Sequence, residues 1–319
     1  MTSFYQQLSI STMYNWKRRL KGATGKMLLD ELIGLGFNTF ELNYQITKEM
    51  LADIESYLER GKINISSIHN VFPHVEGKTF DTDSLLLGYP DEKLRKQAVE
   101  LTKTSVDYAH RYAAKAVVIH PSEIPNPEGL FYDKLLKELY NQGLKGSSKY
   151  NKLFEEMMDH RKKERAKYCD LIVKSVEEVC DYIEKKGYDV VLAIENRAMC
   201  HQIPTFDDMN YIYKKLNDAP LYFWLDIGHG IAMKNLGMFD DFEGIRAIKD
   251  KIYGAHIHDT IGVVDHWVPY TKGDQIDLYL DIIKEIPIKV IEVDDKNSHE
   301  DIIKGIKILN YKLYGGEVL

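Results

Sequence analysis

Eight short runs of apolar and β-branched residues recur along the chain, and longer amphipathic segments separate them. Segments such as 91–113 and 167–187 carry apolar residues at helical spacing, which predicts helices. The runs predict strands, and they cover residues 7–12, 37–42, 63–69, 115–120, 189–195, 221–226, 252–258 and 288–293. Strands that alternate with helices form a parallel sheet, and eight such units favour an α/β fold built as one (β/α)8 (TIM) barrel over an open doubly wound sheet. No GxGxxG motif follows the first strand, and no Walker-type motif occurs, which weakens the nucleotide-binding alternative.

We expect residues 1–319 to form a single TIM-barrel domain, because no linker rich in Pro, Gly or Ser divides them. One connection, between the fourth and fifth strands, is about twice as long as the others. Within it, residues 126–167 predict inserted helices joined by a turn at 141–149. The insertion leaves the C-terminal end of the fourth strand, so it could fold over the barrel mouth as a lid or form a peripheral helical decoration.

Composition and charge exclude several classes of protein. Hydrophobic residues make up 44% of the chain and charged residues 29%, which is typical of a globular protein. The net charge of −7 argues against nucleic acid as a partner. No apolar run approaches the roughly 20 residues that span a bilayer, and the N-terminal segment lacks the pattern of a signal peptide, so we expect no membrane association. Cys169, Cys180 and Cys200 form no CxxC pair, and we expect buried free thiols in a cytoplasmic protein.

The ends of six predicted strands carry side chains that can bind a metal. Each follows a mostly apolar run, as in VVIH, LAIE, FWLD and VIE, and the six residues are His69, His120, Glu195, Asp226, His256 and Glu292. In a (β/α)8 barrel the C-terminal ends of all strands meet at one mouth, so these residues should share one site. Carboxylate and imidazole donors on rigid strands suit a divalent metal, and we therefore expect a metal site at the mouth.

The stretch AHIHDTIGVVDH adds further candidates around the seventh strand. His256 and His258 are two residues apart on a strand, so their side chains point to the same face. We expect His256 to reach the metal, and His258 and Asp259 to lie at the rim, where they could touch substrate or support a ligand. Four further polar candidates lie at or after strand ends. His229, Asp265 and His266 could be further metal ligands. Glu41 ends the second strand, where it could be a structural residue or join the mouth.

These motifs, taken in order, resemble those of the xylose-isomerase-like barrel superfamily. The series runs through FNTFELN, IHNVFP, LGYPDEKLRKQAVE, VVIHPS, AIENR, LDIGHG, HIHDTIGVVDH and VIEVD, and thus covers nearly the whole chain. The superfamily includes sugar phosphate isomerases and epimerases, inosose dehydratase-like enzymes and the zinc-dependent endonuclease IV class, so the resemblance leaves a lyase or a hydrolase open beside an isomerase. The insertion at 126–167 has no counterpart in the usual pattern.

Resemblance to the isomerase and epimerase branch implies one divalent metal, held by Glu195, Asp226, His256 and Glu292. The ligand types suit Mn, Zn, Co or Mg alike. The implied substrate is a small polar molecule such as a sugar, a sugar phosphate or a cyclic polyol, converted through a metal-stabilised enediolate. Glu195 and Glu292 would move the proton, and His229 would assist them at the reacting oxygens. Residues implied or suggested to bind substrate are His120, Arg197, His258 and Trp267, although Arg197 could equally form a structural ion pair.

Resemblance to the endonuclease IV class implies a three-zinc site and a hydrolase that acts on a phosphoester or another small molecule. Its ligands would be His69, His120, Glu195, Asp226, His229, His256, Asp265, His266 and Glu292. One departure is that Asp265 and His266 are adjacent here, where the class separates the two residues by one. Adjacent residues in an extended loop point to opposite sides, so we do not expect both to bind one cluster. Related barrels often pair through their helices, so the chain could form a homo-oligomer.

Overall fold

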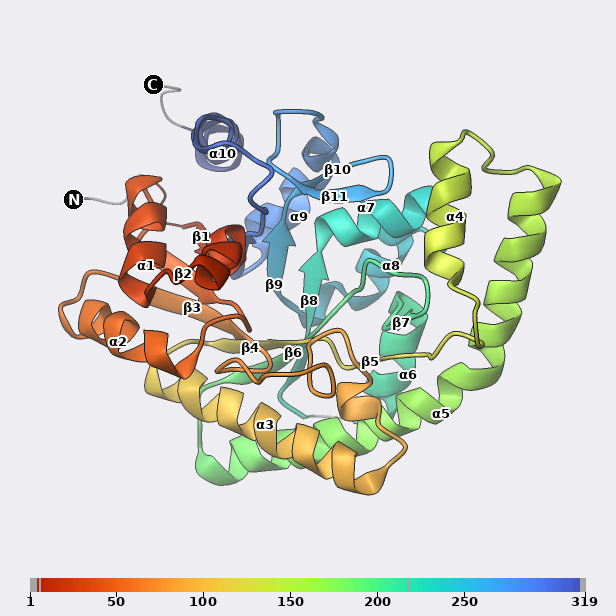
Figure 1. Ribbon diagram of the computed structural model, residues 1–319, viewed down its shortest axis with the longest axis horizontal. Coiled ribbons are helices and arrows are strands. Elements are labelled where there is room, and N and C mark those ends of the chain that lie inside the picture. The colour runs from red at the N-terminus through yellow and green to blue at the C-terminus, as the bar shows by residue number, and fades with distance from the viewer. Residues whose placement is uncertain (1–4, 6, 217–218, 316–319) are drawn as a thin grey trace.

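A closed barrel of eight parallel strands forms the centre of the computed structural model, which describes residue 5 and residues 7–216 and 219–315 (Figure 1). The strands follow one another around the barrel in sequence order, and the last pairs with the first. They are β1 Ser9–Ser11, β2 Thr39–Leu42, β3 Asn64–His69, β4 Ala116–Ile119, β6 Val191–Glu195, β8 Leu221–Asp226, β9 Ile252–Ile257 and β12 Ile288–Ile291. Each lies within one of the eight predicted runs, so the predicted α/β barrel is confirmed.

Helices surround the barrel and follow its strands (Figure 1). The α-helices are α1 Gly25–Gly34, α2 Leu51–Glu59, α3 Glu92–Arg111, α4 Tyr132–Asn141, α5 Ser148–Lys186, α6 Phe206–Lys215, α7 Ile227–Leu236, α8 Asp241–Ile248, α9 Leu280–Glu285 and α10 His299–Tyr314. Short 3-10 helices occupy Thr12–Lys21, Lys48–Met50, Leu86–Gly88, Lys249–Lys251 and Gln275–Tyr279. Among the described residues, no helix combines the length and the apolar character needed to cross a bilayer.

Trp224 fills the interior of the barrel below the mouth. It is fully buried and packs with Ala116, Val118 and Val290. A Cβ on Gly254 of the neighbouring strand would lie 2.1 Å from the Trp224 ring, so this large side chain fits only because position 254 is a glycine. The ring of Trp224 also contacts that of His256, at 5.3 Å between centroids, and thereby forms a rigid apolar floor under the strand ends.

The long fourth connection forms α4 and the first half of α5. Both predicted insertion helices occur, but the second is not separate, because α5 runs without interruption for 39 residues into the helix that covers the barrel. Ser147 caps its start, accepting a hydrogen bond from the Tyr150 backbone, and Gly187 ends it in a left-handed conformation. The insertion lies beside the barrel, where Leu136 and Met157 form one apolar cluster with Met233 of α7 (Figure 1). A role as a lid stays a prediction.

Two short antiparallel pairs, which the hydrophobic pattern did not predict, follow strand ends at the mouth. β5 Ser122–Glu123 pairs with β7 Gln202–Ile203, and β10 Asp259–Ile261 pairs with β11 Val264–Trp267. The second pair forms a hairpin that continues from the end of β9. It therefore extends the wall of the mouth above the seventh strand.

Cys169, Cys180 and Cys200 are buried free thiols, as expected. Burial raises the pKa of Cys169 and that of Cys180 to about 12. Both thiols stay protonated at neutral pH, so neither serves as a nucleophile.

Candidate metal centre

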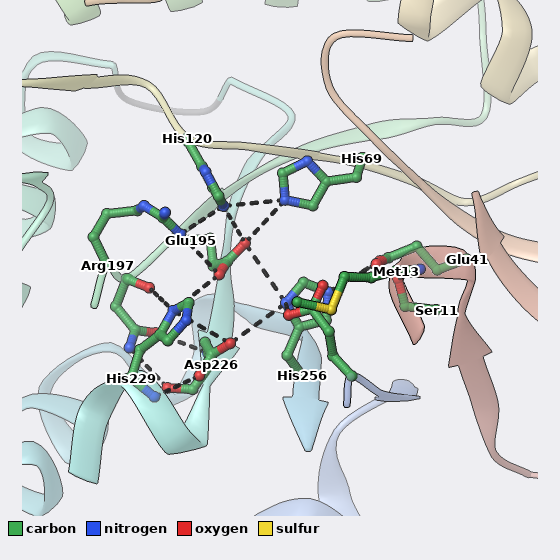
Figure 2. A network of polar contacts seen from close by, with 12 residues as sticks. Ser11, Met13, Glu41, His69, His120, Glu195, Arg197, Asp226, His229 and His256 are labelled. Atoms are coloured by element: carbon green, nitrogen blue, oxygen red, sulfur yellow. Dashed lines mark hydrogen bonds and ion pairs between the residues drawn. The ribbon is translucent and has the colours of Figure 1, made fainter. Parts of the chain in front are cut away.

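Four strand-end side chains converge at the mouth and form what we call the primary group: Glu195, Asp226, His256 and Glu292. All four are buried, and each offers a ligand atom within 4.8 Å of those of the others. The Nδ1 atom of His256 lies 3.6 Å from Oε2 of Glu195 and 3.6 Å from Oδ2 of Asp226 (Figure 2). The same atom lies 3.1 Å from Oε2 of Glu292. The structure thus brings together the four residues that the sequence predicted as metal ligands.

Glu41, at the end of β2, sets the orientation of His256. Its carboxylate lies 3.0 and 3.1 Å from Nε2 of His256 and also accepts a hydrogen bond from Ser67 Oγ at 2.8 Å. A carboxylate only accepts, so Nε2 of His256 carries a hydrogen, and Nδ1 is the ring nitrogen that is left to bind a metal. That buried Nδ1 atom has no hydrogen-bond partner. An unpartnered imidazole nitrogen aimed at three carboxylates fits a divalent metal, with Glu41 as the outer partner that metal-bound histidines usually have.

Negative charge is concentrated around this one imidazole. Burial by itself would raise the pKa of Glu195 and of Asp226, but neighbouring imidazoles outweigh it and hold both values well below the usual range. Burial would lower the pKa of His256, but Glu292, Glu41 and Glu195 raise it well above its usual value. Burial raises the pKa of Glu292 to about 7, and Glu195 and Glu41 add to this shift. The carboxylates of this group thus concentrate negative charge that a divalent cation would balance.

Asn196 and His258 hold Asp226 in place. Asn196 donates from Nδ2 to the Asp226 carbonyl at 2.7 Å and accepts from the Asp226 backbone N–H at 2.8 Å, which locks the ends of β6 and β8 together. His258 Nε2 lies 3.0 Å from the Asp226 carboxylate, and His258 Nδ1 accepts from the His266 backbone N–H at 2.8 Å. Both ring nitrogens of His258 are thus engaged, so no lone pair remains for a metal.

The expected rim position of His258 and Asp259 is wrong, because both side chains are fully buried. The reason is the β10–β11 hairpin, because Asp259 begins β10 and pairs with Trp267, and His258 Nδ1 accepts a hydrogen bond from the His266 backbone in the same hairpin. Trp267 lies on this hairpin, and its ring is 4.8 Å from the ammonium of Lys296 and 5.9 Å from that of Lys272. Stacking of Trp267 on a substrate stays a prediction.

A second group shares Glu195 with the primary group and adds His69 and His120. Nε2 of His69 and Nε2 of His120 lie 3.1 Å apart, and Oε2 of Glu195 is 3.3 and 3.0 Å from them. Arg197 reaches into this group, with Nη1 2.5 Å from His120 Nε2 and 3.1 Å from Glu195 Oε1 (Figure 2). Its Nη2 donates to Asp83 at 2.8 Å. Arg197 is only 6% exposed and forms ion pairs with Asp83 and Glu195, so of its two expected roles the structural one is present here.

A third group of possible ligands near Asp226 comprises His229, His258 and His266, and Asp265 lies beside it; both ring nitrogens of His258 are already engaged. His229 Nδ1 donates to the Asn196 carbonyl at 3.1 Å and His266 Nδ1 to the Glu292 carbonyl at 3.1 Å, so Nε2 is the ring nitrogen that each of them leaves for another partner. The expectation that Asp265 and His266 point to opposite sides is wrong. Oδ2 of Asp265 is 3.8 Å from His229 Nε2, and the His266 ring is 5.4 Å from the His229 ring. His266 has a left-handed φ of 56°, so the loop is not extended there.

Two residues near the site were missed by sequence reasoning. Tyr44 follows the FELN motif, and its ring lies 5.2 Å from that of His69. Asp83 accepts hydrogen bonds from Arg197 and from Gln202, the latter at 3.3 Å. Asp83 belongs to the long loop after β3, where no periodicity or motif indicates which residue turns inward. Tyr44 was open to prediction from its place two residues after the end of β2.

Known proteins share this architecture. The sequence profile of the family described as xylose isomerase-like TIM barrel matches residues 29–312. No sequence among the curated proteins matches the chain. Among solved structures, a D-tagatose 3-epimerase-like protein has a TM-score of 0.66 at 19% identity, covering 97% of this chain and 97% of the other. D-psicose 3-epimerase in the presence of D-fructose has a TM-score of 0.64 at 16% identity, covering 98% and 100%.

Endonuclease IV from Thermus thermophilus is also similar, with a TM-score of 0.56 at 14% identity, and the match covers 97% of this chain and 100% of the other. At such identities the likeness concerns the fold, whereas the sequence profile covers most of the chain and identifies the family. The resemblance noted from the ordered motifs is thereby confirmed. The chain belongs to the xylose isomerase-like TIM barrel family.

Proposed function

We propose that the protein is a divalent-metal-dependent isomerase or epimerase that acts on a sugar, a sugar phosphate or a cyclic polyol. The observation that carries the proposal is the primary group, in which the unpartnered Nδ1 of His256 faces the carboxylates of Glu195, Asp226 and Glu292. Mixed carboxylate and imidazole donors suit Mn, Co, Mg or Zn. The likeness to 3-epimerases in fold supports the same reaction class.

The ion, when bound, would chelate neighbouring substrate oxygens and stabilise the negative charge of an enediolate. Glu195 and Glu292 enter the site from β6 and from the residue after β12, so one carboxylate can remove a proton from the substrate carbon and the other can return it. Glu41 and His258 hold His256 and Asp226 in orientation through their hydrogen bonds. This leaves the carboxylate positions rigid, as proton transfer at a fixed carbon requires.

His229 is the side chain that we assign to a substrate oxygen. Its Nδ1 is used by the Asn196 carbonyl, whereas its Nε2 has the carboxylate of Asp265 only at 3.8 Å. A hydroxyl or carbonyl oxygen of the substrate can approach that nitrogen. His120, proposed from the sequence for the same task, has its Nε2 within 2.5 Å of Arg197, so we give it no direct substrate contact.

Proton transfer can be tested without knowing the product. The protein, loaded with Mn²⁺ or Co²⁺, is incubated in D2O with a panel of ketoses and their phosphates, and deuterium incorporation at the carbon next to the carbonyl is followed by NMR. We expect incorporation with at least one substrate, and a loss of about 100-fold or more in Glu292→Gln, which keeps the size of the side chain but removes the base. Absence of exchange across the panel, in protein that carries metal, would contradict the proposed reaction.

A multinuclear zinc hydrolase of the endonuclease IV class is the second candidate. It is favoured by one observation, namely that the second and third groups lie next to the primary group and offer further imidazole donors. Plasma mass spectrometry on protein purified without chelators separates the two candidates. About one metal per chain supports the isomerase or epimerase, and two or three zinc ions support the hydrolase.

Two further parts of the proposal concern the setting of the protein. A cytoplasmic location is supported by three cysteines that are all buried free thiols. The partner that we propose is a small polar substrate, and the net charge of −7 speaks against nucleic acid. Association into a homo-oligomer stays a prediction.

A further inference from the structure

The second group is a set of electron-pair donors that face one another. Nδ1 of His69 donates to the Asn70 carbonyl at 3.0 Å, so its Nε2 carries a lone pair. Nε2 of His120 lies 2.5 Å from a guanidinium nitrogen of Arg197, which can only donate, so this nitrogen carries a lone pair as well. The remaining hydrogen of His120 is on Nδ1, which lies 3.3 Å from the Asp83 carboxylate and can donate to it.

Three donor atoms in such an arrangement require a cation. The two Nε2 atoms and Oε2 of Glu195 lie between 3.0 and 3.3 Å from one another, and neutral rings in these tautomers place no hydrogen between them. The guanidinium of Arg197 supplies a positive charge there, through 2.5 Å and 3.1 Å contacts from Nη1 to His120 Nε2 and Glu195 Oε1. Asp83 anchors Nη2 at 2.8 Å. Arginine stays charged at every accessible pH, so its cation is permanent.

A metal ion and Arg197 compete for the same electron pair. An imidazole nitrogen has one lone pair, and a metal would need it at about 2.0–2.1 Å. Arg197 Nη1 approaches His120 Nε2 along that lone pair, since a hydrogen bond to an imidazole has no other acceptor site. The metal ion and the guanidinium cannot both bind Nε2 of His120, so a metal could bind there only after the guanidinium had moved away.

We propose that Arg197 is the resident cation of the second group, so that His69, His120 and Glu195 bind no metal in this protein. Arg197 is then a specificity-determining residue, because it keeps the shared Glu195 from bridging two ions. A centre without that bridge suits proton transfer in a polyol, whereas a bridged pair of ions suits hydrolysis of a phosphoester. The inference rests on the proposed function only in that the primary group is taken to hold a metal.

Metal stoichiometry tests the proposal directly. The protein is stripped with a chelator, saturated with Co²⁺ or Zn²⁺, passed through a desalting column and analysed by plasma mass spectrometry. We expect Arg197→Met and Arg197→Gln each to bind one equivalent more than the wild type. The glutamine variant still offers an amide donor to Asp83. Arg165→Met is the matched control, because it removes another guanidinium that pairs with a buried carboxylate, and it should keep the wild-type metal content.

His120→Asn in the wild-type background provides an independent check that does not need the Arg197 variants to fold. It should leave the metal content unchanged, and combined with Arg197→Met it should abolish the gained equivalent. Equal metal content in wild type and both Arg197 variants, or the loss of one equivalent in His120→Asn alone, would overturn the proposal. Failure of the proposed function would be recognised by a different result. In that case Asp226→Ala would bind as much metal as the wild type does.

Discussion

Glu41 offers a quantitative test of how the primary group is built. Its carboxylate is fully buried and contacts Nε2 of His256 through both oxygens, at 3.0 and 3.1 Å. Loss of such a partner lowers metal affinity by about 10–100-fold, or ~1.4–2.7 kcal/mol. A hydrogen bond to a charged group contributes about 1.5–3 kcal/mol, which agrees. We therefore expect Glu41→Gln, which retains an acceptor, to weaken metal binding about 10-fold, and Glu41→Ala to weaken it by about 100-fold.

The assay is a competition titration against a chromophoric chelator at constant pH, with the thermal unfolding of the metal-free protein measured in parallel. Glu41→Gln should not lower the unfolding temperature of the metal-free protein. It removes one of four negatively charged buried carboxylates around a single imidazole, which relieves the repulsion between them. Ser67→Ala is the control, since it removes a hydrogen bond to Glu41 and leaves the contact with His256 in place. Unchanged metal affinity in Glu41→Ala would refute the role assigned to this carboxylate.

Three further outcomes are expected. Gly228→Ala should lower metal affinity, because a Cβ at Gly228 would lie 2.0 Å from the His258 ring and push this ring away from Asp226. Wild-type metal affinity in this variant would contradict the reasoning. Asp208→Asn should cost about 3 kcal/mol in the free energy of unfolding at pH 7, since it leaves the buried guanidinium of Arg161 without its carboxylate. Burial alone would raise the pKa of Asp208, but Arg161 outweighs it and lowers the value. The stabilisation by this ion pair is thus present above the unfolded-state pKa of about 3.9 and is lost as the pH falls through the folded-state pKa. Denaturant titrations should therefore give wild type and variant similar free energies of unfolding in acid and different ones at neutral pH. Removal of the metal should lower the unfolding temperature of the wild type, and calorimetry with and without a chelator should show no such change in Asp226→Ala.

Strand positions and all four residues of the primary group could be predicted from the sequence for a topological reason. Parallel strands of a barrel place all their C-terminal ends at one mouth, so a polar residue that ends an apolar run has its position determined by the fold. Glu195, Asp226 and His256 followed from this rule, and so did Glu292, one residue beyond β12. The length of the fourth connection likewise predicted an insertion, since a barrel crossover needs only one helix.

Contacts between loops and side chains could not be predicted in this way, because they depend on distances that no periodicity encodes. The burial of His258 and the approach of Asp265 to His229 result from the β10–β11 hairpin, in which Gly262 and His266 both have a left-handed φ. The meeting of Arg197 with His120 joins two residues 77 positions apart. Residue types and strand ends thus determine which groups reach the mouth. Only the tertiary structure decides which imidazole nitrogen is left without a partner and which faces a guanidinium, because the sequence pattern does not show which partner each ring takes.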